Sequence, residues 1–205
     1  MYKAIIVDDH ESMCDSLKYA LEGTGEFSVA GTIPAAAHAE VFCERLQPEL
    51  VLLDVCTEGA VSGLDVAETL RKKFPEMKIV IMSGFDEITY VPRTKEIGAH
   101  AFVYKSKSLA YFIDVIQRVM QGGIVYPDER TFPLPLGEVP LTMREMEVLR
   151  LMCKHMTSAE IAEELFISTS TVKYHKANIL GKTGFSKSLD LVFYMLTKGW
   201  INPLH

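Results

Sequence analysis

The chain has 205 residues, of which 48% are hydrophobic and 23% charged, a balance typical of folded globular proteins and of a length that suits two modest domains. Its N-terminus lacks the basic and long apolar segments of a secretory signal, and no apolar run is long enough to cross a membrane. The four cysteines are scattered, which favours reduced thiols. A cytoplasmic protein is therefore expected. Residues 1–137 carry 13 Lys and Arg against 20 Asp and Glu, whereas residues 138–205 carry 8 against 7, so any polyanion is expected to bind the second part.

Five short apolar runs alternate with amphipathic segments over residues 1–121. The runs are Ala4–Val7, Phe27–Ala30, Leu50–Leu53, Ile79–Met82 and Ala101–Tyr104, and helices are predicted at about 12–23, 35–47, 63–74, 86–97 and 108–121. This alternation predicts an α/β domain with a doubly wound, five-stranded parallel sheet and a functional site at the carboxyl ends of the strands. Pro92 predicts that the fourth helix is short, kinked or irregular.

A second, small all-α domain is predicted over residues 138–205, after a linker at 122–137 that is rich in proline and glycine. Thr142 and Glu145 have the spacing of a capping box at the start of its first helix. Ser158 is expected to cap the second helix, and residues 166–168 form a turn into a third helix at about 169–182. A fourth helix is predicted at about 187–198.

Polar residues stand at four of the five strand ends. Asp8 and Asp9 follow the first strand, Asp54 the third, Ser83 the fourth and Lys105 the fifth. Because these strand ends open on one edge of the sheet, the side chains are expected to converge. Three carboxylates there suit Mg²⁺, and an aspartate can act as the nucleophile toward a phosphoryl group.

Each of these residues also has an ordinary structural explanation. Asp8 and Asp9 could simply cap the first helix, and Lys105 could be a solvated surface lysine. The joint placement of five such residues at four strand ends favours a site.

Residues 1–121 resemble the receiver domain of two-component response regulators. The resemblance lies in Val7-Asp8-Asp9-His10, Leu53-Asp54, Met82-Ser83-Gly84 and Lys105 at the end of the fifth strand. The resemblance implies a flavodoxin-like fold in which a histidine kinase phosphorylates Asp54. It implies that Mg²⁺ is held by Asp8, Asp9, Asp54 and the backbone carbonyl of Cys56. It also implies that Ser83 is the switch hydroxyl, that Lys105 pairs with the phosphoryl group, and that Phe102 is an aromatic residue that repacks on activation.

The sequence departs from this family near its phosphoacceptor. The loop at residues 56–59 lacks the usual proline, and Gly63 follows Asp54 by nine residues where eight are usual. Ser106 stands where proline or an acidic residue is common, and Pro92 lies in a helix that normally takes part in switching. The phosphoryl lifetime and the switching geometry are therefore left open.

The third helix of the second domain exposes polar side chains that suit a nucleic acid. Lysines suit phosphates or guanine edges, whereas asparagine and threonine suit base edges or sugar-phosphate oxygens. The candidates for DNA contact are Thr169, Thr171, Lys173, Tyr174, Lys176 and Asn178. Composition alone fits an ordinary solvated helical bundle equally well.

The second domain resembles the LuxR-type DNA-binding domain at many positions. These are Leu141–Leu149, Glu160-Ile161-Ala162, Leu165, Ile167-Ser168, Thr171-Val172-Lys173, His175, Ile179, Lys182 and Gly184. The resemblance implies a helix-turn-helix whose recognition helix places Lys173 and Lys182 on DNA phosphates, while His175 either contacts DNA or supports packing. The last helix, with Leu189, Val192, Phe193 and Leu196, is implied to form a dimer contact, although such a stripe also suits a core.

Together the two parts resemble a response regulator of the NarL/FixJ type. The resemblance implies a transcription regulator that is not an enzyme, with DNA, a sensor histidine kinase and RNA polymerase as partners, and that binds as a homodimer when active. Three alternatives stay open: an orphan regulator that works without phosphorylation, a phosphatase using Asp54 as nucleophile, and a LuxR-type sensor of a small ligand. The last two are disfavoured, because no second acid–base group accompanies the cluster and a ligand-sensing domain would not carry the Asp/Asp/Ser/Lys set.

Overall fold

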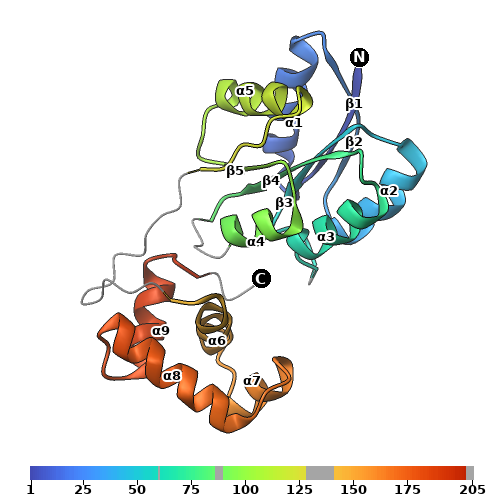
Figure 1. Ribbon diagram of the computed structural model, residues 1–205. Coiled ribbons are helices and arrows are strands. Elements are labelled where there is room, and N and C mark those ends of the chain that lie inside the picture. The colour runs from blue at the N-terminus through green and yellow to red at the C-terminus, as the bar shows by residue number, and fades with distance from the viewer. Residues whose placement is uncertain (60, 86–89, 128–140, 202–205) are drawn as a thin grey trace. The chain divides into compact units, whose positions relative to one another are not determined.

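The computed structural model describes residues 1–59, 61–85, 90–127 and 141–201 (Figure 1). The chain divides into two compact units with separate hydrophobic cores. The start of the predicted fourth helix, at 86–89, and most of the predicted linker lie outside the described residues. Within the described part of the chain, no helix is long and apolar enough to cross a membrane.

The first unit is built on one parallel sheet of five strands in the order β2-β1-β3-β4-β5, which confirms the predicted doubly wound α/β fold. Its strands are β1 (Tyr2–Val7), β2 (Phe27–Ile33), β3 (Leu50–Asp54), β4 (Lys78–Ser83) and β5 (Ala101–Tyr104). The central strands are apolar on both faces because both faces are covered by helices. The carboxyl ends of β1, β3, β4 and β5 consequently meet at one edge.

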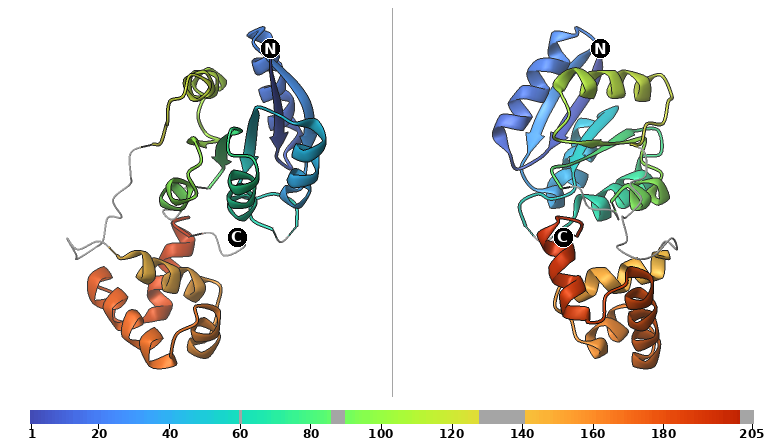
Figure 2. Two further views of the ribbon diagram at one scale, coloured as in Figure 1. Left: turned by 45° about the vertical axis from the view of Figure 1, so that its right-hand side comes forward. Right: turned by 90° about the vertical axis from the view of Figure 1, so that its left-hand side faces the viewer.

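The helices of the first unit form a layer on each face of the sheet. One layer holds α1 (Glu11–Gly23) and α5 (Leu109–Met120), and the other holds α2 (Ala39–Leu46), α3 (Gly63–Lys73) and α4 (Tyr90–Ile97). Figures 1 and 2 show α3, in teal, beside α4, in green. The predicted helix at 35–47 is divided into a short 3₁₀ turn, Ala36–His38, followed by α2.

Pro92 is the third residue of the described part of α4, which has eight residues. Because residues 86–89, before Tyr90, lie outside the described residues, the expectation that this helix is short, kinked or irregular stays a prediction.

A short segment after α5 adds to the edge of the sheet. Val125 forms a parallel bridge with Ala101, donating its amide to the carbonyl of His100 at 2.9 Å and accepting from Phe102 at 3.1 Å. Its side chain is buried in the core, and the Tyr126 hydroxyl donates to the carbonyl of Ala99. The first residues of the predicted linker thus pack against β5.

The second unit consists of helices, as predicted. They are α6 (Met143–Cys153), α7 (Ser158–Glu164), α8 (Thr169–Thr183) and α9 (Ser188–Thr197), arranged around an apolar core (Figure 1). The predicted capping box of Thr142 and Glu145 is confirmed.

The assignment of Ser158 as a helix cap was wrong. Ser158 is the first residue of α7, and Thr157 is the cap that precedes it. The Thr157 hydroxyl accepts from the amide of Glu160, whose carboxylate accepts from the Thr157 amide at 2.7 Å. A capping box needs its acidic residue at the third helical position, and only Thr157 has Glu160 at that distance.

Candidate phosphoacceptor site and DNA-binding helix

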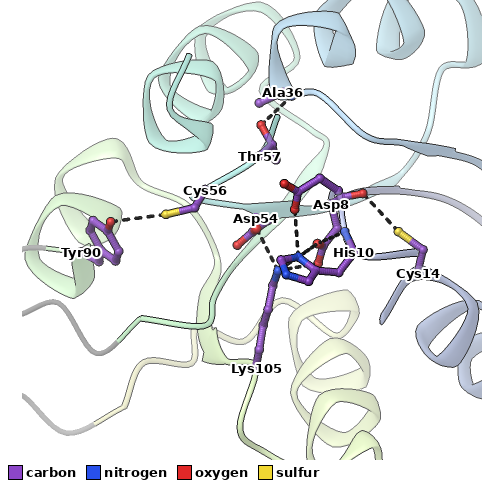
Figure 3. A network of polar contacts seen from close by, with 10 residues as sticks. Asp8, His10, Cys14, Ala36, Asp54, Cys56, Thr57, Tyr90 and Lys105 are labelled. Atoms are coloured by element: carbon purple, nitrogen blue, oxygen red, sulfur yellow. Dashed lines mark hydrogen bonds and ion pairs between the residues drawn. The ribbon is translucent and has the colours of Figure 1, made fainter. Parts of the chain in front are cut away.

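Two buried carboxylates and one lysine meet at the carboxyl edge of the sheet (Figure 3). Asp54 ends β3 and is 1% exposed, and Asp8 follows β1 and is 3% exposed. The Nζ atom of Lys105, just after β5, lies 2.8 Å from Oδ2 of Asp54 and 2.9 Å from Oδ1 of Asp8. The structure therefore brings together residues that are up to 97 positions apart in the sequence.

Charge is only partly balanced in this group. Burial, together with the charge of Asp8, outweighs the lowering influence of Lys105 and raises the pKa of Asp54 to about 6. For Lys105, burial opposes the charged form, but the two aspartates outweigh burial and raise its pKa. One cation thus serves two buried carboxylates, and the site favours a further positive charge.

Asp9 and His10 extend the group toward solvent. The Nδ1 atom of His10 lies 2.8 Å from Oδ1 of Asp9 and 3.2 Å from Oδ1 of Asp8. An open pocket of about 710 Å³ adjoins these residues. It is lined by Asp8, Asp9, Glu11, Cys14, Asp15, Thr32, Ile33, Pro34 and Glu58. Its charged lining is entirely acidic, which suits a cation.

The carboxylate group also has the arrangement of a metal site. One possible ligand atom from each of Asp8, Asp9, His10 and Asp54 lies within 4.8 Å of the others. The Oδ1 atom of Asp54 is buried and has no hydrogen-bond partner among the described residues. A buried carboxylate oxygen without a partner is costly unless a cation binds it, so the three carboxylates of this group fit a hard divalent ion such as Mg²⁺.

Ser83 and Phe102 lie on the strands next to the aspartate. Ser83 is fully buried and ends β4. This strand pairs with β3 in a register that puts Met82 opposite Asp54. The Phe102 ring is buried and makes an edge-to-face contact with the Tyr104 ring at 5.0 Å between centroids. Ser83 thus lies at the carboxyl end of the strand next to β3, whereas Phe102 belongs to the core cluster that includes Tyr90 and Val91 of α4.

The unusual loop after Asp54 is anchored at two points. Thr57 accepts a hydrogen bond from the amide of Ala36 at 2.9 Å, and the Cys56 thiol lies 3.6 Å from the buried hydroxyl of Tyr90 on α4 (Figure 3). Gly63 then closes the loop against β3, where a Cβ atom would lie 1.9 Å from the carbonyl oxygen of Asp54. The glycine is therefore required by close packing, even though the loop before it is one residue longer than usual in this family.

In the second unit, α7 and α8 are joined by a tight turn. Phe166 in this turn has a left-handed backbone, with φ +53°, and its ring is exposed. Ser168 caps α8 and accepts from the amide of Thr171 at 3.1 Å. Val172 and Ile179 anchor α8 in the core, so the helix has a buried and an exposed side.

The candidate DNA-contact residues fall into two groups. Thr169, Lys173 and Tyr174 are exposed, and Thr171 and Asn178 are partly exposed. The two other lysines make contacts within the unit: Lys176 donates to the Ser158 hydroxyl at 2.9 Å, and Lys182 pairs with the buried carboxylate of Glu145 at 2.7 Å. The Nδ1 atom of His175 is buried and has no hydrogen-bond partner among the described residues.

The apolar stripe of α9 is divided between core and surface. Val192 is buried, Leu196 is partly buried, and Leu189 and Phe193 are 72% and 69% exposed. The first two support the core, whereas the second two, one helical turn apart, are available to a partner.

Sequence reasoning did not assign a role to His10 or Tyr90. His10 stands directly after Asp9, so its position beside the carboxylates had a signal in the sequence. Tyr90 had none, because its contact with Cys56 joins residues 34 positions apart.

Two protein-family models match the chain. The model of the response regulator receiver domain matches residues 4–117, and that of the luxR family of bacterial regulatory proteins matches residues 139–195. Among curated proteins, the chain is 30% identical to the uncharacterized transcriptional regulatory protein YvfU of Bacillus subtilis, over 98% of this chain and all of that protein. It is 29% identical to the transcriptional regulatory protein MctR of Rhizobium johnstonii, over 98% of this chain and 96% of the relative.

Solved structures show the same fold. RcsB from Salmonella enterica serovar Typhimurium, bound to the promoter rprA with the phosphomimetic BeF₃⁻, is similar with a TM-score of 0.70 at 18% identity, over 96% of this chain and all of RcsB. The family models and the relatives agree with the two units of the structure. The chain therefore belongs to the two-component response regulators, in which a receiver domain is joined to a luxR-type DNA-binding domain that regulates transcription.

Proposed function

We propose that a sensor histidine kinase phosphorylates Asp54 and that the phosphoryl group controls DNA binding by the luxR-type domain. The observation that carries this proposal is the convergence of Asp54, Asp8 and Lys105 at the carboxyl edge of the sheet. The receiver would span residues 1–121 and the DNA-binding domain 138–205. Residues 122–137 would link them, and the first of these residues pack on β5.

The phosphoryl transfer requires a nucleophile and neutralisation of charge. A carboxylate oxygen of Asp54 attacks the phosphorus of the kinase phosphohistidine, the P–N bond breaks, the imidazole leaves with the electron pair, and an aspartyl phosphate forms. Lys105, already at hydrogen-bond distance from Oδ2, pairs with the phosphoryl oxygens.

Mg²⁺ would be held by Asp8, Asp9, Asp54 and the backbone carbonyl of Cys56. When bound, the ion supplies positive charge to the phosphoryl oxygens. The partial charge balance of Asp8 and Asp54, with one lysine between them, supports this assignment.

Ser83 and Phe102 would transmit the change. The Ser83 hydroxyl donates a hydrogen bond to the phosphoryl group, and movement of the end of β4 allows the Phe102 ring to repack. The phosphoryl group thereby shifts the population of two receiver conformations.

The DNA-binding helix would be α8. The residues we propose to contact DNA are Thr169, Thr171, Lys173, Tyr174, Lys176, Asn178 and Lys182. Of these, Lys173 and Tyr174 are exposed and best placed to reach DNA, whereas Lys176 and Lys182 would first have to leave or share the contacts described above. The exposed Leu189 and Phe193 support a homodimer that binds paired half-sites. The dimer would act in the cytoplasm, with RNA polymerase as a partner at promoters.

The test is to incubate the protein with acetyl phosphate and Mg²⁺ and to weigh the intact chain by mass spectrometry. We expect the mass of one phosphoryl group to be added to the wild type and none to Asp54→Ala, with Asp15→Ala as a control that keeps the addition. Equal addition to Asp54→Ala would contradict the assignment. No addition to the wild type would favour an orphan regulator, and sustained turnover of a phosphate ester would favour an enzyme.

A further inference from the structure

We propose that His10 converts the carboxylate site into a mixed carboxylate–imidazole site that binds a first-row transition-metal ion, in the range Mn²⁺ to Zn²⁺, more tightly than Mg²⁺. This inference rests on the proposed cation site of Asp8, Asp9 and Asp54. It adds a nitrogen ligand, which strengthens the binding of these ions relative to Mg²⁺ beyond what the three carboxylates provide.

The distances of the His10 nitrogen from two carboxylates fit ligands of one ion, and the Asp54 ligand atom lies within 4.8 Å of these atoms. Ligand atoms bound at about 2.0–2.2 Å to an ion of octahedral or tetrahedral geometry lie about 2.8–3.6 Å from their neighbours. The Nδ1 atom of His10 lies 2.8 Å from Oδ1 of Asp9 and 3.2 Å from Oδ1 of Asp8. Figure 3 shows the imidazole ring directed at the carboxylates rather than at α1.

The backbone places the ring in this position. His10 is the residue before α1, with φ −88° and ψ 97°, and its side chain caps no amide of that helix. Its own amide donates to Oδ1 of Asp8 at 3.0 Å, which fixes the start of the side chain beside the carboxylate. The ring is therefore not engaged in ending or starting the helix, and its nitrogen is left to face the acidic group.

Independent features point to a cation at this position. Asp54 is 1% exposed and its Oδ1 atom has no hydrogen-bond partner among the described residues. The adjoining pocket adds the carboxylates of Glu11, Asp15 and Glu58. Lys105 pairs with Asp8 and Asp54, and His10 pairs with Asp8 and Asp9 in the described ion pairs.

The ligand set decides which ion is favoured. Mg²⁺ prefers oxygen ligands and keeps several waters, so an imidazole nitrogen contributes little to its binding. Imidazole suits the first-row transition ions, whose affinities rise from Mn²⁺ to Cu²⁺. The neighbouring Cys56 thiol lies 3.6 Å from the Tyr90 hydroxyl and points away from Asp54 (Figure 3), which leaves nitrogen and oxygen as the ligands.

The test uses Co²⁺ on the full chain, with Mg²⁺ for comparison, by isothermal titration calorimetry and proton NMR. The variants are His10→Gln, Asp8→Asn, and His38→Gln as a control at another exposed histidine of the receiver. We expect wild type and His38→Gln to bind Co²⁺ more tightly than Mg²⁺. His10→Gln should weaken Co²⁺ binding at least about tenfold and Mg²⁺ binding less than about threefold.

NMR gives a signature of direct ligation. A histidine bound to Co²⁺ should give a paramagnetically shifted imidazole N–H signal in H₂O, kept in His38→Gln and lost in His10→Gln. Absence of that signal from the wild type, or equal weakening of both ions by His10→Gln, would overturn the proposal for His10 alone. Unchanged binding of both ions in a folded Asp8→Asn would instead show that the acidic group is not the cation site, and the Mg²⁺ part of the proposed function would fail with it.

Discussion

Asp54 is held between two opposing influences on its charge. Burial disfavours the carboxylate and Lys105 favours it, and the result is a pKa of about 6. Asp8, buried beside it, shares the same lysine. A group that is strongly nucleophilic only when charged is thus kept at the margin of ionisation, and a bound cation moves it toward the charged form.

His100 is a second buried titratable residue, remote in the sheet from Asp54. It precedes β5 and is 8% exposed, and its Nδ1 atom accepts from the amide of Ile79 at 3.2 Å. Burial first, then the charges of Lys78 and Arg71, lowers its pKa to about 4. The neutral ring is therefore part of the folded structure.

The lowered pKa of His100 predicts a loss of stability in acid. Between pH 6.5 and 4 the unfolded chain binds a proton at this residue that the folded chain does not, so the free energy of unfolding falls as the pH falls. We expect His100 to contribute on the order of 2 kcal/mol to the loss between pH 7 and pH 4.5. Urea unfolding at the two pH values should show a smaller loss in His100→Gln.

The raised pKa of Asp54 acts in the opposite direction over the same range. The folded chain keeps a proton there up to about pH 6, so Asp54 makes the folded state more stable as the pH falls. The pH dependence of unfolding should therefore be compared between Asp54→Asn and the double variant Asp54→Asn, His100→Gln, without divalent ions. An equal pH dependence of the two chains would show that His100 is not kept neutral by the fold.

At the scale of the element, α8 carries lysines with different surroundings. Lys173 is exposed, whereas Lys182 reaches back to the carboxylate of Glu145, which is 3% exposed. Burial disfavours the charge of Glu145, but hydrogen bonds from Lys182 and Thr142 outweigh it and lower the pKa. One carboxylate therefore joins α8 to the capping box of α6.

These surroundings predict separable effects of two alanine substitutions. Lys173→Ala should leave stability within about 0.5 kcal/mol of wild type, weaken DNA binding for all sequences alike, and reduce the salt dependence by about one ion. Lys182→Ala should destabilise the second unit by about 1–3 kcal/mol, because Glu145 stays buried with fewer partners. Urea unfolding and fluorescence anisotropy over a range of salt concentrations would measure both.

Either outcome can be contradicted on its own. An unchanged salt dependence in Lys173→Ala would remove this residue from the phosphate contacts. An unchanged stability in Lys182→Ala would show that its pair with Glu145 contributes nothing, as many exposed ion pairs do.

Local sequence predicted most elements but not all of their details. The apolar runs located five strands, because a strand buried on both faces has few polar residues. The run at Phe27–Ala30 was too short, since β2 continues to Ile33 through residues whose pattern is less apolar. Thr157 was missed in favour of Ser158, although the position of Glu160 identifies the true cap.

At the scale of the whole molecule, the two units have cores that share no residue. The first is formed by two clusters, one on each face of the sheet, and the second by the inner sides of α6–α9. Each unit therefore has its own source of hydrophobic stability.

Separate cores predict separate responses to a ligand. Millimolar Mg²⁺ should raise the melting temperature of the receiver, because the ion binds the folded acidic site and relieves repulsion between its carboxylates. The helical unit should melt at an unchanged temperature. Differential scanning calorimetry with Mg²⁺ or EDTA would measure this, and Asp8→Asn should lose the shift; a shift in both units, or in neither, would contradict it.

The sequence by itself predicted the succession of strands and helices along the chain, the division into two domains and the candidate site residues. Hydrophobic periodicity is a local property, and Asp8, Asp9, Asp54, Ser83 and Lys105 each stand beside an apolar run that marks a strand end. Parallel topology then requires these ends to share one edge.

Only the tertiary structure decided how charge and packing are arranged at that edge. The pairing of Lys105 with two buried carboxylates, the contact of Cys56 with Tyr90, and the use of Lys182 by Glu145 join residues between 34 and 97 positions apart. No local pattern reports such contacts, because they depend on which side chains the fold excludes from water together. The docking of Val125 on β5 likewise depends on an open sheet edge, which exists only once the strands have assembled.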